Sequence, residues 1–141
     1  MIDFYLATTT LIMGDNNLLT TVLYILGAIG SVTIIDTVGA VASRKLNFNY
    51  GWLTILPLLV YTLAGYFISA YVNFSLVLLS SLIIGIYDAT VGWKLALIFK
   101  ANMVISDKDK GATSVNFRIV AVTIISFGCS SMGFFLQANT V

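Results

Sequence analysis

The sequence predicts an all-α integral membrane protein in which four transmembrane helices form one bundle. Hydrophobic residues fill 59% of its 141 positions and charged residues only 9%, and the mean hydropathy is +0.99, values far from those of soluble domains. Four apolar runs are each long enough to cross a hydrocarbon core of roughly 30 Å, which takes about 20 helical residues. Because the runs are continuously apolar and do not alternate, they predict helices and not the strands of a membrane barrel.

The four predicted spans are residues 18–43, 52–71, 74–99 and 117–136. The connections between them are too short for a second domain, so we expect residues 1–141 to form a single domain. The segment before the first span, "MIDFYLATTTLIMGDNN", has no basic residue, which argues against a cleaved signal peptide. Its apolar part is too short to span, and we expect it to lie at the outer interface, with "GDNN" breaking the chain before the first span.

The basic residues predict the orientation of the bundle. All seven Lys and Arg residues lie in the two longer connections or in the span ends that face them. The positive-inside rule therefore predicts that these connections, including "SDKDKG", are cytoplasmic and that the N and C termini are outside. We expect the protein to reside in the plasma (inner) membrane.

The first and third spans contain similar segments. "IIDTVGAVASRKL" and "IYDATVGWKLALIFK" each have an Asp followed by Val-Gly and then by a basic residue, and the two acids stand 52 residues apart. Both spans run from outside to inside. This pattern indicates a 2+2 repeat, a two-helix unit used twice in parallel orientation, as in many transporter folds. A chance similarity over so few residues is the alternative.

The composition excludes several classes of function. The chain has a single cysteine and neither His nor Glu, which excludes an intramolecular disulfide, a Ser-His-Asp or Cys-His nucleophile, and most metal chemistry. We therefore expect no cofactor. A net charge of +1 offers no sizeable basic surface for nucleic acid.

Two acids inside the spans are the strongest candidate site residues. Ionisable groups in a membrane are costly and usually face the bundle interior or a water-filled cavity. Asp88 shares a helix stripe with small residues, and so does Asp36, so we expect both to face packed protein and their helices to pack together. The two carboxyls would then share one poorly hydrated site and hold one proton between them. Asp36 lies eight residues before Arg44 and Asp88 twelve before Lys100, which predicts that Asp88 lies near the midplane and Asp36 nearer the cytoplasm.

Further candidates for ion or substrate binding accompany the acids. On a regular helix Lys94 points about 120° away from Asp88, so the two cannot pair directly, and Lys94 can extend to the headgroups instead. The other candidates are polar side chains beside Asp88 or near the cytoplasmic ends of the spans: Tyr87, Asn116 and Arg118. Pro57 either kinks the second span or is tolerated near its start.

Three classes of function fit these features. The first is a homo-oligomeric transporter or channel for an ion or small polar solute, in which Asp88 and Asp36 bind protons or cations. The second is a structural or accessory subunit, in which the acids form assembly ion pairs with Lys94, Arg118 or a partner membrane protein. The third is an intramembrane aspartyl protease, because Tyr87-Asp88 in "GIYD" resembles the Tyr-Asp pair of the presenilin-like family. That family has a second acid in Gly-x-Gly-Asp, whereas Asp36 follows "TII", and four spans are fewer than the family uses.

Overall fold

The computed structural model describes residues 2–103 and 115–140, with side chains from Asn16 onward except that of Val115. These residues form helices and no strand. Four helical stretches are long and apolar enough to cross a membrane: residues 16–46, 50–69, 74–98 and 116–138. The prediction of four apolar spans is therefore confirmed, with small shifts at their ends. The predicted "SDKDKG" loop lies outside the described residues.

The first helix, α1 (Ile2–Leu46), is continuous through the predicted break at "GDNN", so that prediction is wrong. No proline interrupts this segment, and a single Gly costs only about 1 kcal/mol in a helix interior. The hydroxyls of Thr20 and Thr21 donate to the carbonyls of Asn16 and Asn17, one turn earlier. These hydrogen bonds fall within the helix and do not terminate it.

The second span consists of a short 3-10 helix, η1 (Tyr50–Thr54), followed by α2 (Ile55–Ser69). Asn49 caps η1, because its side chain accepts a hydrogen bond from the backbone N–H of Gly51 at 2.9 Å. Pro57 is therefore in the first turn of α2, where a helix has no internal partner for the backbone N–H. It fits this position without interrupting the helix.

The third span is not one regular helix. α3 (Phe74–Tyr87) passes into a π-helical turn, η2 (Asp88–Gly92), and then into α4 (Trp93–Ile98). The hydroxyl of Thr90 donates to the carbonyls of Ile86 and Tyr87 at this junction. The angle predicted between Asp88 and Lys94 assumed a regular helix, and the π turn removes that assumption. Such turns are rare and occur often at functional sites.

The last helix, α6 (Val115–Ala138), packs against α2 and α3 through small residues. A β-carbon added to Gly133 would overlap the carbonyl oxygen of Thr62, and one added to Gly65 would overlap the backbone of Ser130. The hydroxyl of Ser130 donates to the carbonyl of Tyr61 at 3.2 Å. Backbones thus approach closely where α2 and α6 cross, as is typical of helix packing in lipid.

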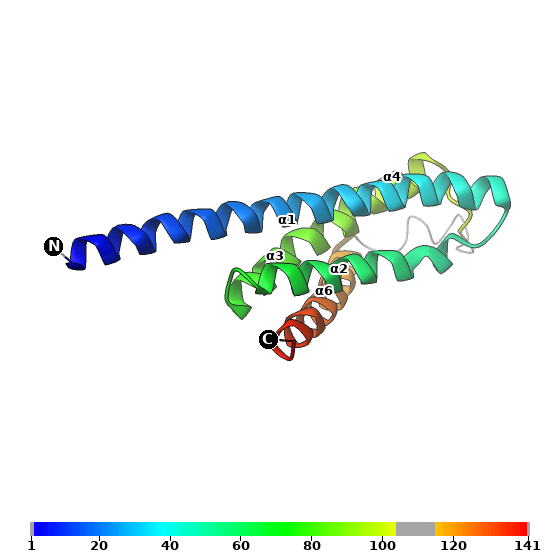
Figure 1. Ribbon diagram of the computed structural model, residues 1–141. Coiled ribbons are helices and arrows are strands. Elements are labelled where there is room, and N and C mark those ends of the chain that lie inside the picture. The colour runs from blue at the N-terminus through cyan, green and yellow to red at the C-terminus, as the bar shows by residue number, and fades with distance from the viewer. Residues whose placement is uncertain (1, 104–114, 141) are drawn as a thin grey trace.

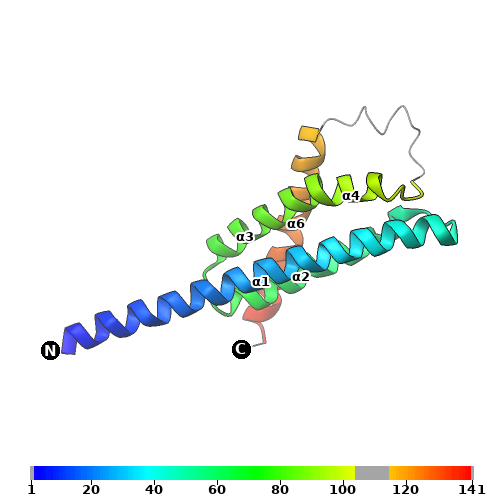
Figure 2. The same ribbon diagram turned by 90° about the horizontal axis from the view of Figure 1, so that it is seen from above.

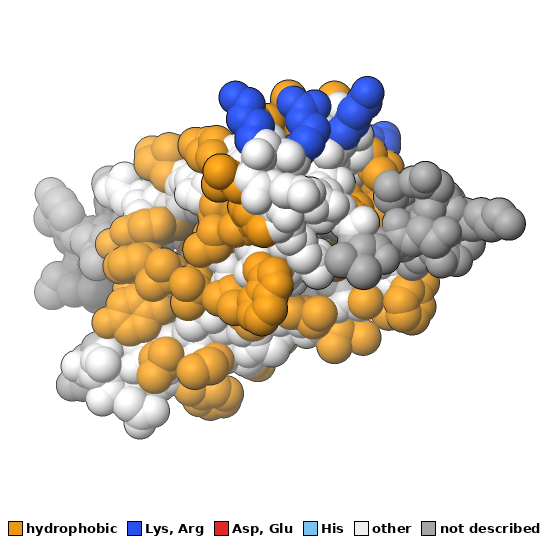
Figure 3. Space-filling view, turned by 90° about the vertical axis from the view of Figure 1, so that its right-hand side faces the viewer, with side chains coloured by type: hydrophobic (Ala, Val, Ile, Leu, Met, Phe, Trp, Pro, Cys, Tyr) orange, Lys and Arg blue, Asp and Glu red, His pale blue; other side chains and the backbone are white. Residues whose placement is uncertain are grey.

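α1 and the α3–α4 stretch run in one direction, while α2 and α6 return (Figure 1). α6 crosses the other helices at a marked angle and its first turns lie apart from α2 (Figure 2). At the end where α1 finishes, Asn102 links the segment after α4 to α1 and η1. Its backbone N–H donates to the Ser43 hydroxyl, and its carbonyl accepts from the N–H of Tyr50. Lys and Arg side chains gather along one edge of this end (Figure 3).

Candidate functional site

Asp36 and Asp88 meet where α1 crosses the π turn. A β-carbon added to Gly92 would overlap a carboxylate oxygen of each acid, Oδ2 of Asp36 and Oδ1 of Asp88. Both oxygens therefore lie beside the same point on the Gly92 backbone, and the two carboxyls are within reach of a mutual hydrogen bond when one is protonated. Gly92 leaves the room for this contact, because any side chain there would separate the acids.

Two tyrosine hydroxyls hold the carboxyls in place. Tyr50 at the start of η1 donates to Asp36 Oδ1 at 2.8 Å. Tyr61 on α2 donates to Asp88 Oδ2. Tyr61 is almost fully buried, with 2% of its surface exposed. Each acid is thus linked to the second span by one charge-assisted hydrogen bond.

One carboxylate oxygen in this cluster has no partner. Asp36 is 4% exposed, and its Oδ2 is buried without a hydrogen bond. Within the described part of the chain, no Lys or Arg side chain forms an ion pair with either acid. Because a buried charge without a counter-charge is costly, the pair is expected to carry one shared proton, which gives it a single negative charge.

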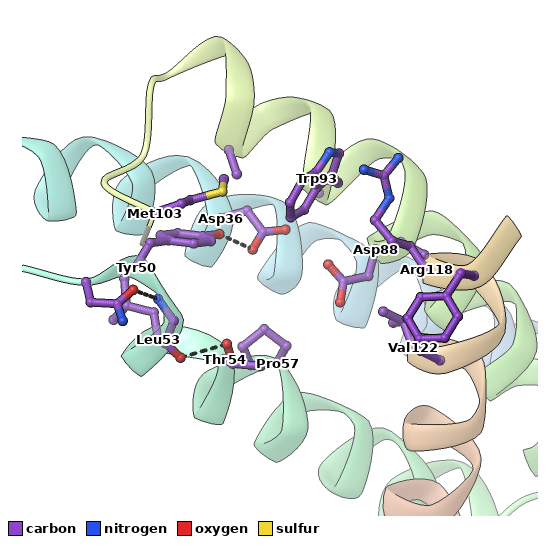
Figure 4. A pocket seen from close by; sticks show the side chains of 17 residues that line it. Asp36, Tyr50, Leu53, Thr54, Pro57, Asp88, Trp93, Met103, Arg118 and Val122 are labelled. Atoms are coloured by element: carbon purple, nitrogen blue, oxygen red, sulfur yellow. Dashed lines mark hydrogen bonds between the residues drawn. The ribbon is translucent and has the colours of Figure 1, made fainter. Parts of the chain in front are cut away.

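The acids lie on the wall of a cavity of about 480 Å³ (Figure 4). Its wall includes residues of η1 and the first turn of α2, the π turn and α4, and the first turns of α6. Apart from the acids and a few polar groups the lining is apolar or aromatic, and includes Leu53, Pro57, Trp93 and Val122. The cavity is therefore formed where the start of α6 diverges from the start of α2.

Arg118 lines the same cavity from α6. Its guanidinium carbon lies 4.5 Å from the centre of the Trp93 ring, a cation–π contact. Its Nε is buried without a hydrogen bond. In Figure 4 the guanidinium lies beside Trp93, and the carboxylate of Asp88 points away from it.

The six residues predicted for the site divide into two sets. Asp36, Asp88 and Arg118 line the cavity, and Tyr87, Lys94 and Asn116 do not. Lys94 and Asn116 are exposed. Tyr87 is half-buried and its hydroxyl is hydrogen-bonded to Thr33 of α1 at 2.8 Å, so it links α3 to α1 outside the cavity.

The predicted difference in depth between the acids is wrong. Asp36 lies ten residues before the end of α1, and Asp88 lies ten residues before the end of α4. The prediction counted from Arg44 and Lys100, but Arg44 lies before the end of α1 whereas Lys100 lies after the end of α4. The two carboxyls stand at one level, because an oxygen of each lies beside the same point of Gly92.

Tyr50 is the site residue that the sequence reasoning missed. It lies between two spans, and only the path of the chain after α1 brings it back to Asp36, fourteen residues earlier. Trp93 was not among the predicted site residues, and it lines the cavity against Arg118. A search for hydroxyl donors at the depth of the acids could have found Tyr61 but not Tyr50.

The arrangement can hold and release a proton or bind a positively charged group. In the residues that the structure describes, no three His, Cys, Asp or Glu side chains cluster in a way that could hold a metal ion. Comparisons with protein-family models, with curated proteins and with solved structures found no match to this chain.

Proposed function

We propose that this chain is a small membrane transporter or channel for an ion or small polar solute, with the Asp36–Asp88 pair as its protonatable group. The observation that carries the proposal is a close carboxyl pair on the wall of a cavity, of which Asp36 is buried and Asp88 half-buried, with no basic side chain in an ion pair with either acid among the described residues. Ionisable groups inside membrane spans are costly, and they are typical of ion and proton pathways.

The chemistry of such a site follows from its shared proton. With one proton the pair carries one negative charge and accepts a cationic group or a second proton. When the second proton binds, the pair becomes neutral, and a cationic group is released. Competition between proton and solute for one pair of carboxyls is sufficient to couple their movements.

The rest of the proposed arrangement follows the distribution of charge. We propose that the end bearing the Lys and Arg side chains is cytoplasmic, that both termini are outside, and that the membrane is the plasma (inner) membrane. The 2+2 repeat is supported by the matching places of the two acids on helices that run the same way. We also propose a homo-oligomer, since one four-helix chain offers few walls for a complete pathway.

The test is proton flux into vesicles that contain the purified protein and an internal pH-sensitive dye. Asp88→Asn is expected to reduce flux driven by a membrane potential to that of empty vesicles, because the amide cannot take up a proton. Tyr87→Phe is the matched control, since it alters the neighbouring residue outside the cavity and should retain wild-type flux. Wild-type flux in Asp88→Asn would refute the proposal.

The same variant separates transport from a structural role. If the acids serve only in assembly, Asp88→Asn lowers the amount of folded protein or breaks up its oligomer. If they serve transport, the folded oligomer persists and only flux is lost. Size-exclusion chromatography of the variant in detergent distinguishes these results.

One observation favours a second candidate, the intramembrane aspartyl protease. Two carboxyls within reach of a shared proton are what that chemistry requires: one takes a proton from water as its oxygen attacks a peptide carbonyl, and the other protonates the carbonyl oxygen. As the intermediate collapses and the C–N bond breaks, the carboxyl that took the proton from water gives it to the departing nitrogen. Cleavage of a membrane-spanning peptide that is lost in both Asp36→Asn and Asp88→Asn would establish this activity.

A further inference from the structure

Two buried polar atoms of opposite character lack partners in the same cavity. Asp36 Oδ2 is a hydrogen-bond acceptor on α1, and Arg118 Nε is a donor on α6. Both residues line the cavity of about 480 Å³, and neither is paired with the other. The proton shared with Asp88 can satisfy Asp36 Oδ2, because Asp88 Oδ1 lies beside the same point of Gly92. Arg118 Nε has no such neighbour, and because buried polar groups are nearly always satisfied, it points to a missing acceptor.

The charges of the cavity favour a ligand that carries both signs. The carboxyl pair with its shared proton contributes one negative charge, and the guanidinium of Arg118 contributes one positive charge. The rest of the wall is largely apolar, and charges interact more strongly beside apolar groups than in water. A simple cation would be repelled by Arg118, and a simple anion would be repelled by the acids.

We propose that the cavity binds a small zwitterion of the α-amino acid type, with its ammonium at Asp36 and Asp88 and its carboxylate at Arg118. Trp93 holds the guanidinium by stacking, which leaves the edge of the guanidinium free to donate to a carboxylate. The cavity volume lies toward the small end of ligand pockets, which span about 300–1,000 Å³. Leu53, Pro57 and Val122 provide an apolar surface for an aliphatic side chain.

This inference rests on the proposed function only for the role of the bound ligand. Its test measures ligand binding and not transport. The chain has two tryptophans, and Trp52 is 74% exposed whereas Trp93 lines the cavity. In a Trp52→Phe background, Trp93 is therefore the sole tryptophan and reports on occupancy of the cavity by its fluorescence.

Three probes of matched side chain separate the charges. L-leucine carries both charges, leucinamide carries only the ammonium, and N-acetyl-leucine carries only the carboxylate. L-leucine is expected to bind at least about tenfold more tightly than either of the others, because each lost contact is a hydrogen bond to a charged group. Leucinamide binding as tightly as leucine would overturn the proposal in favour of a cation site, and no saturable response to leucine would overturn it outright.

Variants assign each charge to its residue. Arg118→Gln should abolish the preference for leucine over leucinamide, and Arg118→Lys should restore part of it. Asp36→Asn should abolish the preference for leucine over N-acetyl-leucine. A preference that survives both the Arg118→Gln and the Asp36→Asn change would contradict the assignment of the ligand to this cavity.

The outcomes also separate this inference from the proposed function. Leucine binding without any flux in vesicles would support the proposed ligand class and refute the transport function. Proton flux that depends on Asp88, without leucine binding, would support the transport function and refute the proposed ligand class.

Discussion

Each acid of the carboxyl pair accepts a hydrogen bond from one tyrosine hydroxyl, so the loss of a single hydroxyl leaves one acid without that donor. Tyr61 donates to Asp88 from α2, and its side chain is almost completely buried. The other tyrosine of α2, Tyr66, lies near the end of the helix and is half-buried, and its hydroxyl contacts Thr140, just beyond α6, at 3.4 Å. The two positions therefore test the same chemical change in different surroundings.

We predict that Tyr61→Phe lowers the free energy of unfolding by about 1–3 kcal/mol, because it leaves the half-buried carboxylate of Asp88 without its donor. Tyr66→Phe should change it by less than about 0.5 kcal/mol, since its contact is long and exposed. Unfolding in mixed detergent micelles, followed by helical circular dichroism, measures both. Equal stability of the two variants would mean that the Tyr61–Asp88 bond contributes little to the fold.

At the same scale, Gly92 determines whether the acids meet. A methyl group at this position would overlap both carboxyls, so Gly92→Ala is expected to separate them and to reduce flux at least as much as Asp88→Asn. Gly30→Ala is the control on α1, because nothing lies within 4 Å of its added carbon. Flux is measured in the same vesicles, and an active Gly92→Ala protein would contradict the need for a close carboxyl pair.

Among the elements, α6 shows how glycines of one helix differ in role. Gly133 meets the backbone of α2 directly, whereas nothing lies within 4 Å of a carbon added to Gly128. We predict that Gly133→Ala destabilises the protein by more than about 1 kcal/mol through forced separation of α2 and α6. Gly128→Ala should stabilise it slightly, because alanine is the better helix former by about 1 kcal/mol. Thermal unfolding of both variants measures the difference, and a stable Gly133→Ala protein would show that the crossing can widen.

The elements also mark where sequence reasoning was sufficient. Hydropathy and length predicted the four apolar helices, because a span needs enough consecutive apolar residues whatever its neighbours are. Small residues on the stripes of Asp36 and Asp88 predicted inward faces, and both acids do face the bundle. The π turn at Asp88 could not be predicted, because it depends on how α1 packs against that turn and not on local composition. Tyr50 was missed for a similar reason, since its contact depends on the turn that follows α1.

For the whole molecule, the unequal distribution of charge separates the two ends. The basic side chains that the structure describes lie toward the end where α1 and α4 finish, and the turn before α3 lies at the other end. No charged residue occupies that turn. A bundle with such ends should insert in one orientation, because translocating several cations costs far more than translocating none.

We predict that single cysteines at the two ends are labelled from opposite sides of the membrane. In a Cys129→Ser background, which removes the native thiol, Leu46→Cys lies at the end of α1 and Ser75→Cys at the start of α3, and both side chains are exposed. A membrane-impermeant maleimide should label Ser75→Cys in intact cells and Leu46→Cys only in inverted vesicles. Labelling of both cysteines in intact cells would indicate insertion in two orientations, and the reverse pattern would place the basic end outside. The reverse pattern would also change the side from which the proposed ligand enters, because the cavity wall includes η1 and the first turns of α2 and α6, at the end that bears the basic side chains.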